Sequence, residues 1–150
     1  MKPFPHRYEV RLTSGPRGHA TVSVAGLPPM HAAPPYEFDG PGDAWSPEHL
    51  LLAAVETCFL FTFRAIASAA HVEFLAIDVI TEGVVERIDE VTRFTEIVVR
   101  PHVTLALGAD RARAYRVVAR AERACIVSAS LATPVRVEPE IETEAIAAAG

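Results

Sequence analysis

The residues most able to do chemistry in this chain are its two cysteines, Cys58 and Cys125. In a reducing compartment, two thiols far apart in sequence are more often free thiols or a transient redox pair than a structural disulfide. A free cysteine in an apolar stretch is usually an inert small hydrophobic residue with a raised pKa. The sequence therefore leaves two interpretations open: two buried apolar residues, or two thiols that react.

A reactive thiol at Cys58 needs a cation, because its neighbours are mostly apolar and do not stabilise a thiolate. Arginine suits this role, since it stays charged and offers a fork of donors. A carboxylate such as that of Glu48 can hold an arginine through a bidentate pair.

The sequence gives little support for a metal site, a phosphate-binding loop or a serine nucleophile. The six histidines form neither H-x-H nor H-E-x-x-H, and the cysteines form no C-x-x-C, so we expect no metal. The DGPGD segment at 39–43 lacks the glycine spacing and the preceding strand of a phosphate-binding loop. Neither G-x-S-x-G nor S-x-x-K occurs to indicate a serine nucleophile. The sequence thus predicts no metal and no cofactor.

Length and charge narrow the class of protein. A chain of 150 residues, 50% hydrophobic and 22% charged, fits one domain with a substantial core. The net charge of −5 argues against nucleic acid or an anionic membrane as a partner. The first residues, MKPFPHRYEVRL, contain no apolar segment of a secretory signal, and the most apolar run, 50–63, is interrupted by Glu56. We expect a cytoplasmic protein.

The N-terminal part predicts a hairpin followed by a loop. Residues 6–13 and 19–25 alternate in polarity like strands, and SGPRG at 14–18 is a turn signal between them. Residues 26–44 hold five of the 12 prolines, so we expect an irregular connection there.

A long helix is predicted from residue 46 to about residue 70. Ser46 is a good N-cap, Pro47 suits the first helical position, and Glu48 complements the helix dipole. Almost every side of this helix is apolar, which is typical of a buried helix. It therefore needs a sheet, another helix or another subunit on every face.

The C-terminal half adds a long hairpin, a second helix and a last strand. Residues 72–87 and 91–107 are rich in strand-forming residues, and Asp110 is placed to cap a helix that ends near Ala124. The arginines of that helix are typical of a solvated face. A short helical segment follows at Cys125, and residues 134–142 alternate like a closing strand. With strands in adjacent antiparallel pairs, the predicted fold class is α+β.

Two motifs resemble the OsmC/Ohr superfamily of thiol peroxidases: SPEHLLLAAVETCF at 46–59 and AERACIVSASL at 121–131. The specific features are the Pro-Glu pair with a cysteine ten residues beyond the glutamate, and the A-E-x-A-C-x-V-S signature. The resemblance covers nearly the whole chain, so we expect one domain, 1–150. It implies an OsmC-like α+β fold, in which antiparallel sheets wrap around central buried helices in an intertwined homodimer.

By position, the resemblance implies that Cys58 is the peroxidatic thiol and Cys125 the resolving thiol. Glu48 matches the family's glutamate, and Arg17, in the turn of the first hairpin, matches the arginine of the organic-hydroperoxide branch. Ile126 stands where many members have proline, a departure that removes no reactive group.

The implied activity is reduction of organic hydroperoxides, with hydrogen peroxide as a further substrate, in oxidative-stress defence. Cys58 would become a sulfenic acid and then a disulfide with Cys125, which a dithiol reductant such as protein-bound lipoyl would reopen. The alternative is a dimer that has kept the fold but serves stress response or small-molecule binding without turnover.

The spacing of Glu48 and Cys58 also bears on assembly. Ten residues of straight helix span about 15 Å, so the two cannot meet through one arginine on the same helix. Antiparallel packing of two copies about a two-fold axis would bring Glu48 of one copy towards Cys58 of the other. We therefore expect a composite site at the interface of a homodimer.

Overall fold

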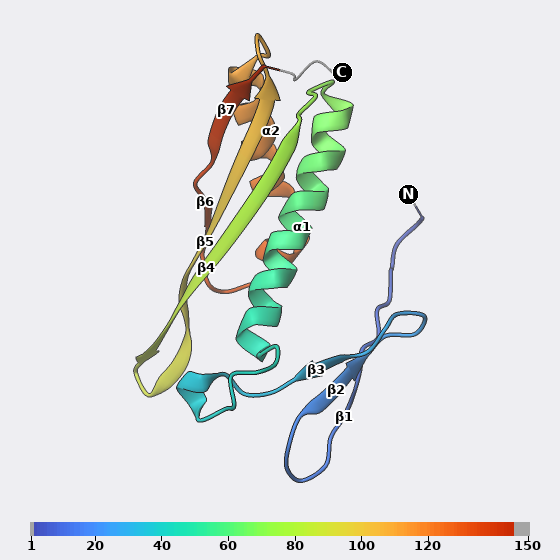
Figure 1. Ribbon diagram of the computed structural model, residues 1–150, viewed down its shortest axis with the longest axis vertical. Coiled ribbons are helices and arrows are strands. Elements are labelled where there is room, and N and C mark those ends of the chain that lie inside the picture. The colour runs from blue at the N-terminus through green and yellow to red at the C-terminus, as the bar shows by residue number, and fades with distance from the viewer. Residues whose placement is uncertain (1, 146–150) are drawn as a thin grey trace. The chain divides into compact units, whose positions relative to one another are not determined.

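The computed structural model describes residues 2–145 and separates the chain into two compact units, Met1–Leu51 and Leu52–Gly150 (Figure 1). The long helix α1, Pro47–Ala69, begins in the first unit and continues in the second. The expected single domain, 1–150, includes Met1 and 146–150, which lie outside the described residues, and it stays a prediction.

The first unit contains a three-stranded antiparallel sheet in the order β1-β2-β3, formed by Arg11–Thr13, Ala20–Ser23 and Met30–Ala32. The first two strands are the predicted hairpin, with shorter strands than the alternation suggested. The third strand is a correction, because the proline-rich connection was expected to be irregular. None of its five prolines lies within the strand, since two precede Met30 and three follow Ala32, so the backbone N–H groups of the strand remain free to pair with β2, where His31 lies opposite Thr21.

The loop after β3 folds back on itself. It contains a short 3-10 helix, η1, at Tyr36–Phe38. Gly40 donates its N–H to the carbonyl of Pro35 at 3.0 Å, and a Cβ at Gly40 would lie only 1.8 Å from the carbonyl oxygen of Pro34. Only glycine fits this close approach. The loop then returns to the sheet, where the N–H of Ala33 donates to the carbonyl of Trp45.

Helix α1 starts where the sequence predicted. The backbone N–H of His49 donates to Oγ of Ser46 at 3.2 Å, which confirms Ser46 as the N-cap. Pro47 is the first helical residue, a position where its missing N–H costs nothing.

Within residues 2–145, one stripe of α1 is buried, at every fourth residue: Val55, Phe59, Phe63 and Ala67. The other faces are partly or fully exposed, and Phe61 keeps 61% of its surface accessible. The sequence predicted that α1 is covered on every face, and within residues 2–145 one face is buried. By length and composition alone α1 could cross a membrane, a property it shares with core helices of soluble proteins.

The predicted hairpin of the second unit is confirmed as β4 (Ala76–Ile88) and β5 (Val91–Ala106). The two turn residues, Asp89 and Glu90, both have positive φ (49° and 66°), as the tight turn between twisted strands requires.

The end of the chain forms two strands, β6 (Val135–Val137) and β7 (Glu140–Glu144), and both pair with β5 in parallel. The sequence predicted one closing strand at 134–142 and gave it no partner, so the division into two strands is a correction and the parallel pairing is a new finding. The chain leaves β5 and returns through helices, and such a crossover makes the joined strands parallel. Pro139, which has no N–H to donate, lies between β6 and β7.

The crossover consists of α2 (Arg111–Ala124) and the short α3 (Ile126–Ala129), as the sequence predicted. Oδ1 of Asp110 accepts the N–H of Arg113 at 2.9 Å, so Asp110 is the expected N-cap. The core of the unit joins the α1 stripe to the inner faces of the sheet and α2, and its members include Ile97, Val99, Val103, Leu105, Ala114, Val117, Val118, Ala121 and Ile141.

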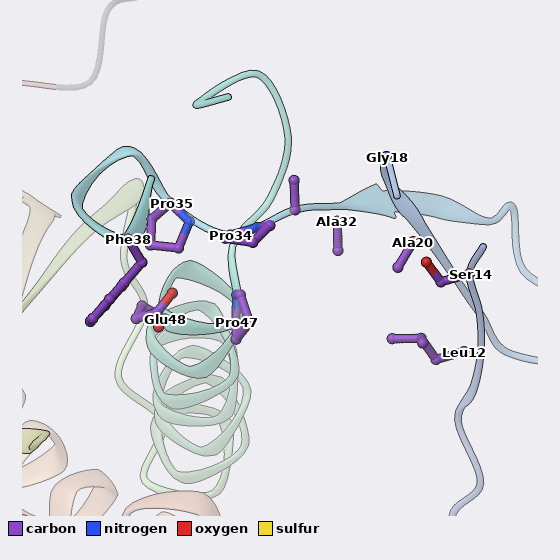
Figure 2. A pocket seen from close by; sticks show the side chains of 11 residues that line it. Leu12, Ser14, Gly18, Ala20, Ala32, Pro34, Pro35, Phe38, Pro47 and Glu48 are labelled. Carbon is purple, nitrogen blue, oxygen red and sulfur yellow. The ribbon is translucent and has the colours of Figure 1, made fainter. Parts of the chain in front are cut away.

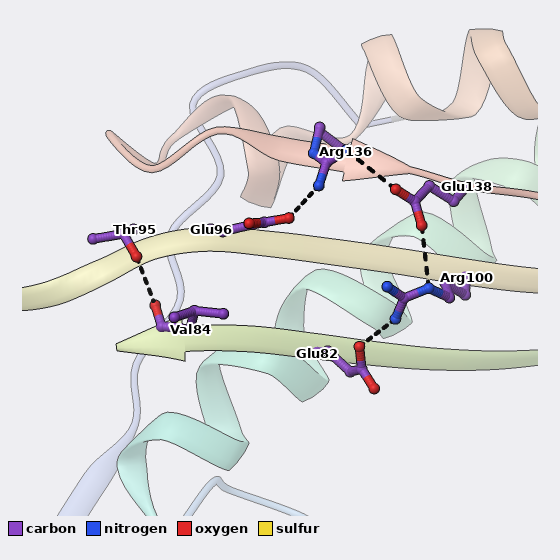
Figure 3. Close-up of polar contacts among 7 residues, drawn as sticks. All are labelled: Glu82, Val84, Thr95, Glu96, Arg100, Arg136 and Glu138. Carbon is purple, nitrogen blue, oxygen red and sulfur yellow. Dashed lines mark hydrogen bonds and ion pairs between the residues drawn. The ribbon is translucent and has the colours of Figure 1, made fainter. Parts of the chain in front are cut away.

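The outer face of this sheet carries a ladder of alternating charges (Figure 3): Glu82, Arg100, Glu138, Arg136 and Glu96. Nε of Arg100 lies 3.2 Å from Oε2 of Glu138, and Nη1 of Arg136 lies 3.1 Å from Oε1 of the same glutamate. Exposed ion pairs of this kind contribute little to the free energy of unfolding. They do neutralise the positive charges of Arg100 and Arg136, each of which contacts two carboxylates.

Candidate functional site

The second unit brings the two cysteines together. Cys58 projects from α1, whereas Cys125 stands between α2 and α3, and both are free thiols. Each acts on the pKa of the other through a side-chain hydrogen bond, so these residues, far apart in sequence, are neighbours in the fold. Cys125 is buried, with 1% of its surface accessible, and Cys58 is half-buried.

Both sulfurs face the start of α3. The backbone N–H groups of Ile126 and Val127 act on Cys58, and those of Val127 and Ser128 act on Cys125. Oγ of Ser128 also donates to Sγ of Cys125 at 3.1 Å. Donors that point at a sulfur favour its thiolate form.

These surroundings separate the two thiols in acidity. Burial raises the pKa of Cys58, and the neighbouring Cys125 raises it further, while the N–H of Val127 opposes the change. At Cys125 burial also acts to raise the pKa, but hydrogen bonds, first that of the Ser128 hydroxyl, outweigh burial and leave the pKa lowered. The two thiols therefore titrate as one interacting pair, in which hydrogen bonds favour the thiolate of Cys125 more than that of Cys58.

Acidity and access thus favour different thiols. Cys58 is the thiol open to a substrate, and Cys125 is the one that ionises more readily. A resolving thiol must itself attack as a thiolate, which a low pKa at Cys125 favours. A nucleophilic Cys58 needs a cation, and no lysine or arginine within residues 2–145 is among the groups that act on its pKa.

The first unit holds a cavity of about 370 Å³ with Glu48 in its wall (Figure 2). The rest of the lining is mostly apolar and comes from the sheet, the loop after β3 and the start of α1: Leu12, Ser14, Gly18, Ala20, Ala32, Ala33, Pro34, Pro35, Phe38 and Pro47. Oε2 of Glu48 is buried and finds no hydrogen-bond partner in the described part of the chain. Because an unsatisfied buried carboxylate oxygen is costly, this position calls for a donor or a cation.

Arg17 is in the turn between β1 and β2, directly before Gly18 in the cavity wall. Its side chain is exposed, and no ion pair joins it to Glu48 among residues 2–145. The four residues predicted for the site therefore fall into two groups. Cys58 and Cys125 adjoin in the second unit, and Glu48 and the turn of Arg17 border one cavity of the first.

Ser128 is a residue of the thiol site that the sequence analysis did not single out. Its hydroxyl reaches Cys125 because the cysteine occupies the N-cap of α3 and the serine lies three residues later. This spacing resembles that of a helix capping box, so the contact could have been inferred from the short helical segment that was predicted at Cys125.

The OsmC-like protein family model matches residues 40–140, which include Glu48, Cys58 and Cys125 but not Arg17. Among curated proteins, the uncharacterized protein YmaD of Bacillus subtilis (strain 168) is 31% identical over 109 residues, or 71% of this chain and 73% of that protein. The chain belongs to the OsmC-like family.

Solved structures agree on the fold. An OsmC-like protein of unknown function from Vibrio cholerae has a TM-score of 0.82 at 18% identity, over 91% of this chain and all of its own. An organic hydroperoxide resistance protein from Legionella pneumophila is also similar, with a TM-score of 0.73 at 23% identity over 93% of this chain and 99% of that one. Another, from Elizabethkingia anophelis, has a TM-score of 0.74 at 18% identity over 96% of this chain and 100% of that one. The predicted α+β, OsmC-like fold is confirmed.

Proposed function

We propose that the protein is a cysteine-based peroxidase that reduces organic hydroperoxides to alcohols, as a defence against oxidative stress. The observation that carries the proposal is the adjacency of Cys58 and Cys125 at the start of α3, in a chain with no other cysteine. Two thiols so placed can store two electrons and release them as a disulfide.

The proposed cycle begins at Cys58, the more accessible thiol. Its thiolate attacks one oxygen of the peroxide, the O–O bond breaks, and the leaving alkoxide takes up a proton to become the alcohol. Sulfur is oxidised to a sulfenic acid. The thiolate of Cys125 then attacks this sulfur, which forms the disulfide and releases hydroxide that is protonated to water. A dithiol returns both cysteines to thiols.

The cavity of the first unit supports organic hydroperoxides as the main substrates and hydrogen peroxide as a poorer one. Its mostly apolar wall suits an alkyl or aryl group, and Glu48 offers the single carboxylate. The relatives from Legionella pneumophila and Elizabethkingia anophelis, which share the fold, carry the name of organic hydroperoxide resistance proteins.

We further propose that the site is completed in a homodimer. Among residues 2–145, most faces of α1 are partly or fully exposed, and so is every residue of the first unit's sheet except Ala32. Helix α1 runs without interruption from Pro47 to Ala69, so Glu48 and Cys58 stay about 15 Å apart within one chain. A second copy would bring its own Arg17 and Glu48 to Cys58 and supply the missing cation. A cytoplasmic location fits this cycle, because free thiols persist in a reducing compartment.

Thiol titration before and after one equivalent of cumene hydroperoxide tests the activity. The proposal predicts that both thiols of each chain disappear, that one equivalent of alcohol forms, and that dithiothreitol restores the thiols. Unchanged thiols would contradict it. They would favour a binding or stress-response dimer without turnover, an alternative that the raised pKa of Cys58 also supports.

A further inference from the structure

Helix α2 presents a stripe of four exposed arginines, Arg113, Arg116, Arg120 and Arg123, here called the arginine stripe. At 3.6 residues per turn these positions fall within about 80° of the helix circumference, and the stripe is about 15 Å long. With Arg111, helix α2 holds five of the 14 lysines and arginines of the chain.

The arginine stripe is largely unpaired, unlike the arginines of the sheet. Arg100 and Arg136 are each held by two glutamates. Within the described residues, the only carboxylate within 4.0 Å of the stripe is that of Asp110, which lies 3.8 Å from Arg116. Glu122, the one acidic residue of α2, instead accepts the backbone N–H of Val137 at 3.2 Å.

This concentration of charge is unfavourable for the isolated helix, because like charges three and four residues apart repel one another. The chain as a whole is acidic, with a net charge of −5. An uncompensated cationic stripe on such a chain is therefore a local feature that an acidic partner would neutralise.

The stripe also leads to the redox pair. Arg123 precedes Cys125 by two residues, at the end of α2 where the chain passes into α3. We propose that the arginine stripe is the docking surface for an acidic protein that carries a dithiol and reduces the Cys58–Cys125 disulfide. This inference rests on the proposed function, since only an oxidised pair needs a donor.

A protein fits better than a nucleic acid or a membrane. The stripe is short, and the net negative charge of the chain repels an extended polyanion. A compact acidic patch on a protein would contact the arginine stripe and would not extend over the acidic remainder of the chain. Charge complementarity of this kind raises the rate of encounter more than the final affinity.

The exchange that follows docking is balanced in atoms and electrons. A donor thiolate attacks the sulfur of Cys58, which is the more accessible one, and Cys125 leaves as a thiolate. The second donor thiolate then attacks the mixed disulfide and releases Cys58. The donor ends as a disulfide, and the protein gains two electrons and two protons. The lowered pKa of Cys125 makes it the better leaving group.

The test uses two synthetic peptides that carry the same Cys-Gly-Gly-Cys dithiol, one flanked by glutamates and the other by glutamines. The full-length protein is first oxidised with diamide, so that the docking test does not depend on peroxidase activity. Rates of disulfide reduction are then measured with each peptide and with dithiothreitol, at low and at high salt. We expect the acidic peptide to react about tenfold faster at low salt, and high salt to remove this advantage.

The Arg113→Gln/Arg120→Gln variant should lose the advantage of the acidic peptide and keep the wild-type rate with dithiothreitol. The control, Arg7→Gln/Arg93→Gln, changes the net charge equally at exposed arginines elsewhere and should keep the advantage. Equal rates for the two peptides on the wild-type protein would overturn the inference, as would an advantage that survives in the stripe variant. Tighter binding of a short DNA duplex or an anionic vesicle than of the acidic peptide would also overturn it. Failure of the proposed function is recognised separately, by a protein that peroxide does not oxidise.

Discussion

The two units differ in how far they bury their own apolar residues. In the second unit, Phe59, Phe63 and Ile97 keep at most 1% of their surface accessible. In the first, Leu12 keeps 61% and Tyr8 86%, and every residue of β1 is exposed. Three short strands with little cover on either face are at best marginally stable alone. The second unit closes a core by itself, and we infer that the first depends on cover that a second copy would supply.

The same difference divides the candidate site. The thiols of the second unit already have each other and the donors of α3. The carboxylate of Glu48 in the first unit has a buried oxygen with no partner among residues 2–145. The two thiols therefore contact each other within the chain, although Cys58 still lacks a cation, and Glu48 has no partner for its buried oxygen among residues 2–145.

The largest effect is expected at the two thiols. Cys58→Ser should abolish peroxide consumption, because it removes the accessible thiol that attacks the O–O bond. Cys125→Ser should allow one turnover and leave Cys58 oxidised, because no second thiol remains to form the disulfide. Mass spectrometry of both variants after peroxide checks this, and a sulfenic or sulfinic acid on Cys125 of the Cys58→Ser protein would reverse the assignment.

Substitutions at Arg17 and Glu48 should reduce activity while they spare stability. If Arg17 neutralises the thiolate, Arg17→Ala should lower the peroxidase rate by on the order of 10²-fold and raise the pKa of Cys58. Glu48→Gln keeps the shape but loses the charge, so a smaller loss is expected. The pH dependence of Cys58 alkylation by iodoacetamide measures the change, with Arg7→Ala as the control. An unshifted profile for Arg17→Ala would remove that residue from the site.

Substitution of two phenylalanines on opposite faces of α1 distinguishes the face that is buried within the chain from the face that we propose a second copy covers. Phe63→Ala should lower the free energy of unfolding by about 3–5 kcal/mol, because Phe63 is fully buried in the core of the second unit. Phe61, which is 61% exposed, should affect assembly instead. Urea titration and sedimentation at several concentrations separate the effects. A Phe61→Ala protein that remains as dimeric as the wild type would contradict the role of this face.

The smallest expected effect concerns the acidity of Cys125. Ser128→Ala removes the hydroxyl that donates to its sulfur, so the pKa of Cys125 should rise. Thiolate forms above the pKa, and alkylation of Cys125 at pH values below the ordinary thiol range should therefore become severalfold slower. Ser130→Ala is the matched control, since that hydroxyl donates to the carbonyl of Ile126. Equal slowing in both variants would assign the effect to α3 as a whole.

Local signals predicted much of the fold. The cap at Ser46, the cap at Asp110 and the β4–β5 hairpin each depend on residues close in sequence, and all three are confirmed. The strand β3 and the parallel pairing of β6 and β7 were not predicted. The pairing of these strands depends on a partner strand elsewhere in the chain, and the alternation of polarity within a short segment does not identify that partner.

The site was predicted unevenly for the same reason. The pairing of Cys58 with Cys125 came from a family resemblance, because nothing local to either residue indicates the other. The contact of Ser128 with Cys125 and the higher acidity of Cys125 depend on how α3 begins. The predicted link between Arg17, Glu48 and the thiol joins parts of two units, and it stays a prediction.

Subunit complementation tests the central claim, that two copies assemble the site, most directly. Arg17→Ala and Cys58→Ser chains with different affinity tags are co-expressed, and the mixed dimer is isolated and assayed with cumene hydroperoxide. If Arg17 acts on Cys58 of the other copy, the mixed dimer has one intact site, because the Cys58→Ser chain supplies Arg17 to the remaining thiol. We predict about half the wild-type activity per dimer. A mixed dimer no more active than either parent variant would contradict the account, since it would place Arg17 and Cys58 of each site in the same chain.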